Sequence, residues 1–166
     1  MRSPTTSVLR TLDDALTGLR RVWLHPGRRR RFLAELGEPV ELAVLRTLRA
    51  IELVGGTRSV AGSEPGVREE PGVSDVAAAL AVKTSTASRL VEDAVAHGYV
   101  TRVASEVDRR RAVLRLTPEG ARLLDRATAV RASLLAEVTA DWSREDVATL
   151  ARLLERLQRD FARLDR

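Results

Sequence analysis

Apolar residues recur every three or four positions over most of the chain, which is the period of an amphipathic helix. The segments with this pattern are 7–24, 40–54, 73–82, 84–97, a stretch after Pro118 and a stretch after Ser143. A break at 25–27 and a basic run at 28–31 precede a further short helical segment that ends at Gly37. Residues 99–104 alternate weakly and predict a strand, and residues 112–116, after a polar turn, predict the returning strand. We therefore expect a mainly α-helical fold with one small β-hairpin.

Local signals indicate where these elements begin and end. We expect an N-cap at Ser74, a glycine stop at Gly98, a helix start at Thr117-Pro118-Glu119 and a capping box of Ser143 with Asp146. Between residues 55 and 72 the apolar pattern gives way to glycine and proline. This segment is expected to be a long flexible loop.

Composition limits the function classes. The 166 residues are 44% hydrophobic but only 3% aromatic, which predicts a core of leucine, valine and alanine. The absence of cysteine excludes disulfides, thiolate catalysis and thiol-based redox sensing. Apolar runs are too short to span a bilayer and no secretion signal is visible, so we expect a soluble cytoplasmic protein without a membrane partner. His25 and His97 stand apart from other ligands, so no metal or other cofactor is expected.

The net charge is +5, and Lys83 is the only lysine. Arginine suits phosphate and guanine recognition, but the same composition arises from GC-rich codons in a bacterial genome. Both interpretations stay open for the total charge. The positions of the arginines carry more information.

The order helix, turn, helix, strand, basic turn, strand over residues 73–116 is typical of a winged helix-turn-helix. In that motif the second helix lies in the major groove of DNA. Its expected core face is Ala87, Leu90, Val91 and Ala94, and the opposite face carries short polar and basic residues. The DNA-binding candidates there are Lys83, Thr84, Ser85, Thr86, Ser88 and Arg89. Taken alone, this face also fits an ordinary solvated helix surface.

The hairpin tip strengthens the DNA-binding interpretation. It contains Asp108 followed by Arg109, Arg110 and Arg111, and arginines on a narrow turn suit the negative potential of a narrow minor groove. Asp108 is expected to pair with a neighbouring arginine and hold it in position.

Two stretches resemble the MarR family of winged helix-turn-helix regulators. Leu80 to Val100 is similar to that family's recognition helix and its exit, and Asp108 to Gly120 is similar to its wing. The resemblance implies a homodimer on a pseudo-palindromic site, with Arg110 in the minor groove, Asp108 orienting it, and Arg109 and Arg111 near phosphates. It also favours repression over activation.

The resemblance implies three regions. They are an N-terminal dimerisation segment at 1–36, a winged helix-turn-helix domain at 39–120 with its loop at 55–72, and C-terminal dimerisation helices at 121–166. This sequence departs from the family in its longer loop, in Ala94 where a larger apolar residue is usual, and in Asp93 where a basic residue is common. We expect Val95 to compensate for Ala94.

Small-molecule effectors of the MarR family bind between the dimer helices and the winged domain. The candidate effector-binding residues here are Trp23, His25, Phe32 and Trp142, for which core packing and a chain turn are the alternative.

No phosphate loop, nucleophile elbow or catalytic triad is visible, so we do not expect an enzyme. An architectural DNA-binding protein and a protein-interaction module remain as alternatives. Strong preference for one DNA sequence would indicate a regulator, whereas an architectural protein would bind with steep salt dependence and little preference.

Overall fold

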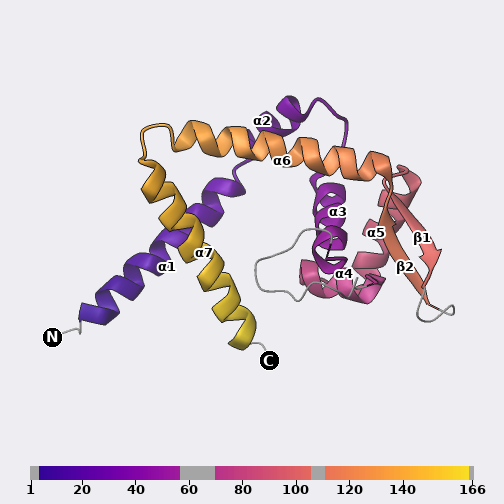
Figure 1. Ribbon diagram of the computed structural model, residues 1–166, viewed down its shortest axis with the longest axis horizontal. Helices are drawn as coiled ribbons and strands as arrows, with labels where there is room; N and C mark the ends of the chain where they lie inside the picture. The colour runs from indigo at the N-terminus through magenta and orange to yellow at the C-terminus, as the bar shows by residue number, and fades with distance from the viewer. Residues whose placement is uncertain (1–3, 57–69, 106–110, 165–166) are drawn as a thin grey trace. The chain divides into compact units, whose positions relative to one another are not determined.

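The computed structural model describes residues 4–56, 70–105 and 111–164. Within these ranges the chain forms seven α-helices and one antiparallel hairpin (Figure 1), which confirms the expected fold class. The elements are α1 (Pro4–Trp23), α2 (Pro26–Leu36), α3 (Leu42–Val54), α4 (Val73–Leu80), α5 (Thr84–Ala96), β1 (Val100–Ala104), β2 (Ala112–Leu116), α6 (Pro118–Val138) and α7 (Arg144–Leu164).

The winged domain has an aliphatic core, as the composition predicts. Helices α3, α4 and α5 pack against one another, and the hairpin joins them through contacts of β2 with α3 and of β1 with α5. The largest fully buried side chains come from α3, α4, α5, β2 and α6, and they include Leu48, Val76, Val91, Leu114 and Leu123. Burying each such side chain stabilises the fold by about 1.5–3 kcal/mol. The core therefore fixes α5 and the hairpin on one scaffold.

Several predicted helix ends are confirmed. Gly98 adopts a left-handed φ of 74° after His97, the C-cap of α5, and the Tyr99 amide donates to the Ala94 carbonyl oxygen at 3.0 Å. This is a Schellman ending, in which glycine avoids the steric cost of positive φ. Ser143 caps α7, because the Asp146 amide donates to Ser143 Oγ at 3.0 Å, and the Ser143 hydroxyl also donates to Asp146 Oδ2 at 2.6 Å.

Two predicted boundaries are wrong. Ser74 is not the N-cap of α4: Gly72 is, and its amide donates to Asp75 Oδ2 at 2.7 Å. The break at 25–27 is shorter than expected, because α2 begins at Pro26 and includes the basic run. Proline is well suited to the first helical position, and His25 caps this helix by accepting the Gly27 amide on Nδ1 at 3.1 Å.

The turn of the helix-turn-helix is made by Ala81, which ends α4. Its φ of 53° and ψ of 46° place it in the left-handed region, which is unfavourable for a residue with a Cβ atom. The α4 helix therefore stops before Val82, two residues earlier than the apolar pattern predicts. The reversal allows α5 to start at Thr84.

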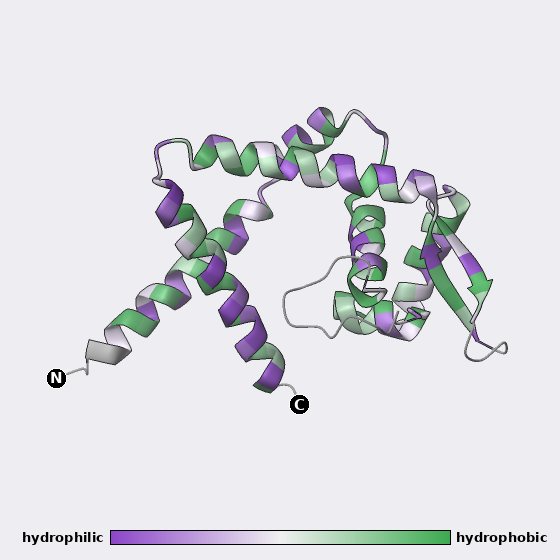
Figure 2. Cartoon of the chain, viewed as in Figure 1, coloured by the Kyte–Doolittle hydropathy of each residue, from purple (hydrophilic) through white to green (hydrophobic). Residues whose placement is uncertain are grey.

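The chain divides into two compact units, Met1–Thr128 and Ala129–Arg166, with the boundary inside α6. Helix α7 in the second unit has no buried residue, and its apolar and charged residues alternate along its length (Figure 2). Helix α1 in the first unit also exposes large apolar side chains. In the ranges that the structure describes, no helix is both long and apolar enough to cross a membrane.

Candidate nucleic-acid interface

Helix α5 presents two different faces. Ala87, Val91 and Ala94 are fully buried against α3 and α4, and Leu90 is half-buried. The small Ala94 is accommodated at this packing surface, whereas Val95 points outward and does not compensate for it. The opposite face therefore lies in solvent on a helix that its neighbours hold firmly.

That solvent face carries the residues predicted to bind DNA. Five of them are exposed, namely Lys83, Thr84, Ser85, Thr86 and Arg89, and Ser88 is half-buried. Within the described part of the chain, no hydrogen bond or ion pair occupies the side chains of these six residues. Their donors are therefore available to a ligand.

The start of α5 adds a further feature. Lys83 occupies the N-cap position, and its side chain forms no capping hydrogen bond. The first amides of a helix carry partial positive charge, which favours an anion such as a phosphate at this end. The positive charge of the Lys83 ammonium group would also attract a phosphate to this end of α5.

The wing is a hairpin of two five-residue strands in the register Val100–Leu116 to Ala104–Ala112. Arg111 is exposed at the start of β2, whereas Asp108, Arg109 and Arg110 lie outside the described residues. Arg102 on β1 is a further exposed cation that sequence reasoning missed. No local sequence signal singled it out, because the burial of β1 does not alternate strictly and the neighbouring Thr101 is exposed as well.

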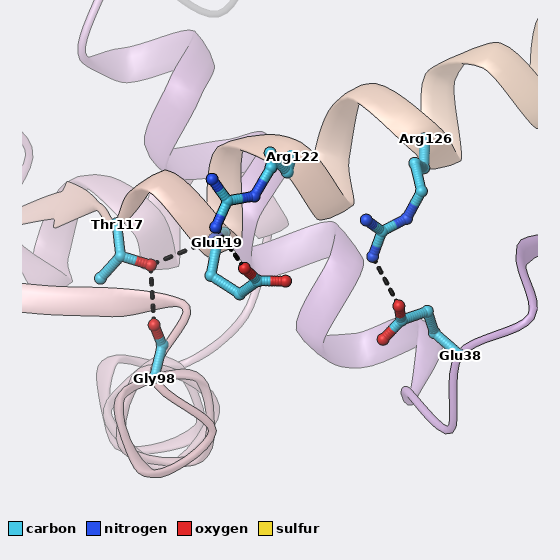
Figure 3. Close-up of polar contacts among 7 residues, drawn as sticks. Glu38, Gly98, Thr117, Glu119, Arg122 and Arg126 are labelled. Atoms are coloured by element: carbon cyan, nitrogen blue, oxygen red, sulfur yellow. Dashed lines mark hydrogen bonds and ion pairs between the residues drawn. The ribbon is translucent and has the colours of Figure 1, made fainter.

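The exit of α5 is attached to the start of α6 (Figure 3). Thr117 Oγ1 donates to the Gly98 carbonyl oxygen at 2.7 Å and accepts the Gly120 amide at 3.1 Å. A single hydroxyl thus caps α6 and binds the last turn of α5. The predicted helix start at Thr117-Pro118-Glu119 is confirmed.

Two ion pairs follow along α6 (Figure 3). Arg122 binds Glu119 at 2.5 Å, and this hydrogen bond, with the positive charge of Arg122, holds the pKa of the Glu119 carboxyl below its usual value. Arg126 binds Glu38 at 2.6 Å and so joins α6 to the segment between α2 and α3. Both pairs are exposed, so each contributes little to stability.

The architecture and the sequence were compared with known proteins. A MarR family protein from Bacillus stearothermophilus has a similar structure, with a TM-score of 0.68, 20% identity and coverage of 98% of this chain and 99% of that one. A MarR family regulator from Silicibacter pomeroyi DSS gives a TM-score of 0.64, 21% identity and coverage of 95% and 91%. The chain has the MarR fold.

The sequence agrees over a shorter range. The model of the MarR family matches residues 67–111, which contain α4, α5 and β1, so the resemblance to this family is confirmed. A search of curated proteins finds no match. S. aureus MepR bound to ethidium bromide is also similar in structure, with a TM-score of 0.55, 15% identity and coverage of 84% of this chain and 95% of that one.

The four effector candidates have different surroundings in this MarR fold. Phe32 is buried in the core, and the His25 ring caps α2, so both have structural roles. Trp23 at the end of α1 and Trp142 before α7 are exposed, and they belong to different units. In the described ranges, no cluster of three or more metal-ligating side chains is present.

Proposed function

We propose that the chain is a transcription regulator that binds duplex DNA with sequence specificity, as a homodimer on a pseudo-palindromic operator. The observation that carries this proposal is the free polar and basic face of α5, in a chain whose two hairpin strands are joined in the sequence by a segment with three consecutive arginines. A helix braced on its buried side and unpaired on its exposed side is what major-groove recognition requires. The MarR fold supports the same conclusion.

In this proposal the side chains in and just before α5 make two kinds of DNA contact, with bases and with phosphates. Arg89 reads a base edge, because a guanidinium group can donate two parallel hydrogen bonds to guanine. Lys83 and the hydroxyls of Thr84 and Ser85 bind phosphates at the start of the helix. Arg110 enters the minor groove with Asp108 as its orienting partner.

Dimerisation is supported by the apolar faces of the terminal helices. Val8 on α1 is 68% exposed and Leu164 on α7 is 79% exposed, and both helices carry further exposed leucines. A monomer would leave this surface in water, whereas a second copy would bury it. We therefore assign residues 1–36 and 121–166 to dimerisation and residues 39–120 to DNA binding.

The proposal extends to repression that a small molecule relieves. MepR was solved with ethidium bromide, and the indoles of Trp23 and Trp142 are each exposed, so that a flat aromatic ligand can stack on either of them. We assign the protein no catalytic activity and expect it to act in the cytoplasm, where a bacterial operator lies. Quenching of tryptophan fluorescence by candidate ligands would test the effector site.

Selection from randomised duplexes tests the DNA-binding proposal. The full-length protein should enrich a pseudo-palindrome whose half-sites are centred about ten base pairs apart or a multiple of that spacing. Retention of duplexes without an enriched motif would indicate an architectural protein instead. Failure to retain any duplex would indicate a protein-interaction module.

A further inference from the structure

The residues that lead into α4 lie against the base of the wing. The Leu114 amide donates to the Pro71 carbonyl oxygen at 2.8 Å, and the Ser105 hydroxyl donates to Glu70 Oε2. Glu70 and Pro71 directly precede Gly72, the N-cap of α4. Both strands of the hairpin are therefore bound to the segment that starts the helix-turn-helix.

The bond from Leu114 has a structural reason. The Ser105 amide donates to the Arg111 carbonyl oxygen at 2.9 Å, and hydrogen-bonded pairs alternate along an antiparallel ladder. Leu114 pairs with Arg102 at a position where the amide points away from β1. Because Leu114 is buried, its amide needs another acceptor, which Pro71 supplies.

The bond from Ser105 fixes the end of β1. Ser105 is only 2% exposed, and it directly precedes the tip of the wing. A buried hydroxyl requires a partner, and a carboxylate is a stronger acceptor than a neutral group. Glu70 thus holds the residue from which the arginine-bearing tip extends.

We propose that Glu70 is a positioning residue for the wing. It holds the hairpin against the start of α4, and α4 braces α5, so wing and recognition helix keep a fixed spacing. Glu70 itself is not assigned to DNA contact. The inference rests on the proposed function, because the spacing matters only if both elements bind one site.

Operator binding by Glu70→Ala tests this role. Its affinity should fall about tenfold, since a lost hydrogen bond to a charged group loosens the wing base. Glu70→Gln keeps an oxygen acceptor for Ser105 and should retain most of the affinity. Glu41→Ala removes an exposed carboxylate that forms no capping hydrogen bond at the start of α3, and it should change nothing.

Double-mutant cycles distinguish positioning from general destabilisation. Combined with Arg110→Ala, Glu70→Ala should cost little more than Arg110→Ala alone, because both disable the wing. Combined with Arg89→Ala, the loss of binding free energy caused by Glu70→Ala should add to the loss caused by Arg89→Ala, because α5 makes a separate contact with DNA. Equal additivity in both cycles, or wild-type affinity in Glu70→Ala, would overturn the inference.

Amide exchange gives a readout that needs no DNA. The Leu114 amide should exchange faster in Glu70→Ala than in the wild type or Glu41→Ala. Unchanged exchange would refute the role of Glu70 even if operator binding is confirmed. If the wild type binds no DNA, the proposed function fails, and Glu70 then loses its role in positioning the wing for DNA.

Discussion

Gly120 on α6 lies directly against the backbone of Tyr99, which stands between the C-terminal cap of α5 and the start of β1. A Cβ atom at position 120 would stand 2.1 Å from the Tyr99 carbonyl oxygen and 2.9 Å from its carbonyl carbon. The same carbonyl oxygen accepts the Thr117 amide at 3.0 Å. Only glycine permits this approach, which brings the segment after α5 and the start of α6 together.

Gly120→Ala should therefore destabilise the fold by about 3 kcal/mol, because backbone atoms must move to admit one methyl group. Denaturant unfolding measures the change. Gly18→Ala is the matched control: nothing lies within 4 Å of its added Cβ in the middle of α1. That control should gain about 0.5–1 kcal/mol from helix propensity. Equal stability of the two variants would contradict the close approach.

Ala81→Gly should stabilise the protein by about 0.5–1 kcal/mol. Glycine relieves the left-handed strain at φ 53°, and this gain exceeds the greater entropy it adds to the unfolded chain. Ala78→Gly, in the neighbouring helix α4, should instead cost about 1 kcal/mol. Thermal unfolding of both variants checks the opposite signs, and a loss of stability in both would show that residue 81 is not strained.

Arg110→Ala should weaken operator binding about tenfold or more, while the dimer mass and the melting temperature stay unchanged. The reason is the proposed minor-groove contact at the wing tip. Arg30→Ala removes the same charge from α2 and is the control for net charge. Fluorescence anisotropy with labelled operator measures both. Undiminished affinity in Arg110→Ala would remove the wing from the interface.

Arg89→Ala should reduce discrimination between the operator and single-base variants by about 1–3 kcal/mol at one position. Arg89→Lys keeps the charge but not the paired donors, so it should lose the same discrimination. A titration series over the variant sites checks this. An equal loss on every sequence would make Arg89 a phosphate contact.

Much of the fold could be predicted because the spacing of apolar residues and the capping residues indicate the same helix boundaries. The returning strand at 112–116 and the glycine at position 98 each have one simple structural solution, and both are confirmed. The end of α4 could not be predicted, since Ala81 is a good helix former and its left-handed conformation is imposed by the packing of α4 and α5.

The site was predictable in part. Exposure of Lys83, Ser85 and Arg89 follows from helical periodicity, because the buried positions of α5 define the opposite face. The brace formed by Glu70 with Ser105 was not predictable, since the two residues are 35 positions apart and no local pattern links them. The roles of Lys83, Ser85 and Arg89 as DNA contacts, and of Glu70 as a positioning residue, stay predictions.

The central claim is that this protein prefers one DNA sequence. The direct test is an equilibrium titration of the wild type with the selected duplex and with a scrambled duplex of equal composition, at two salt concentrations. We predict a preference of about a thousandfold or more that persists at the higher salt. Equal affinity for both duplexes, falling steeply with salt, would contradict sequence-specific regulation.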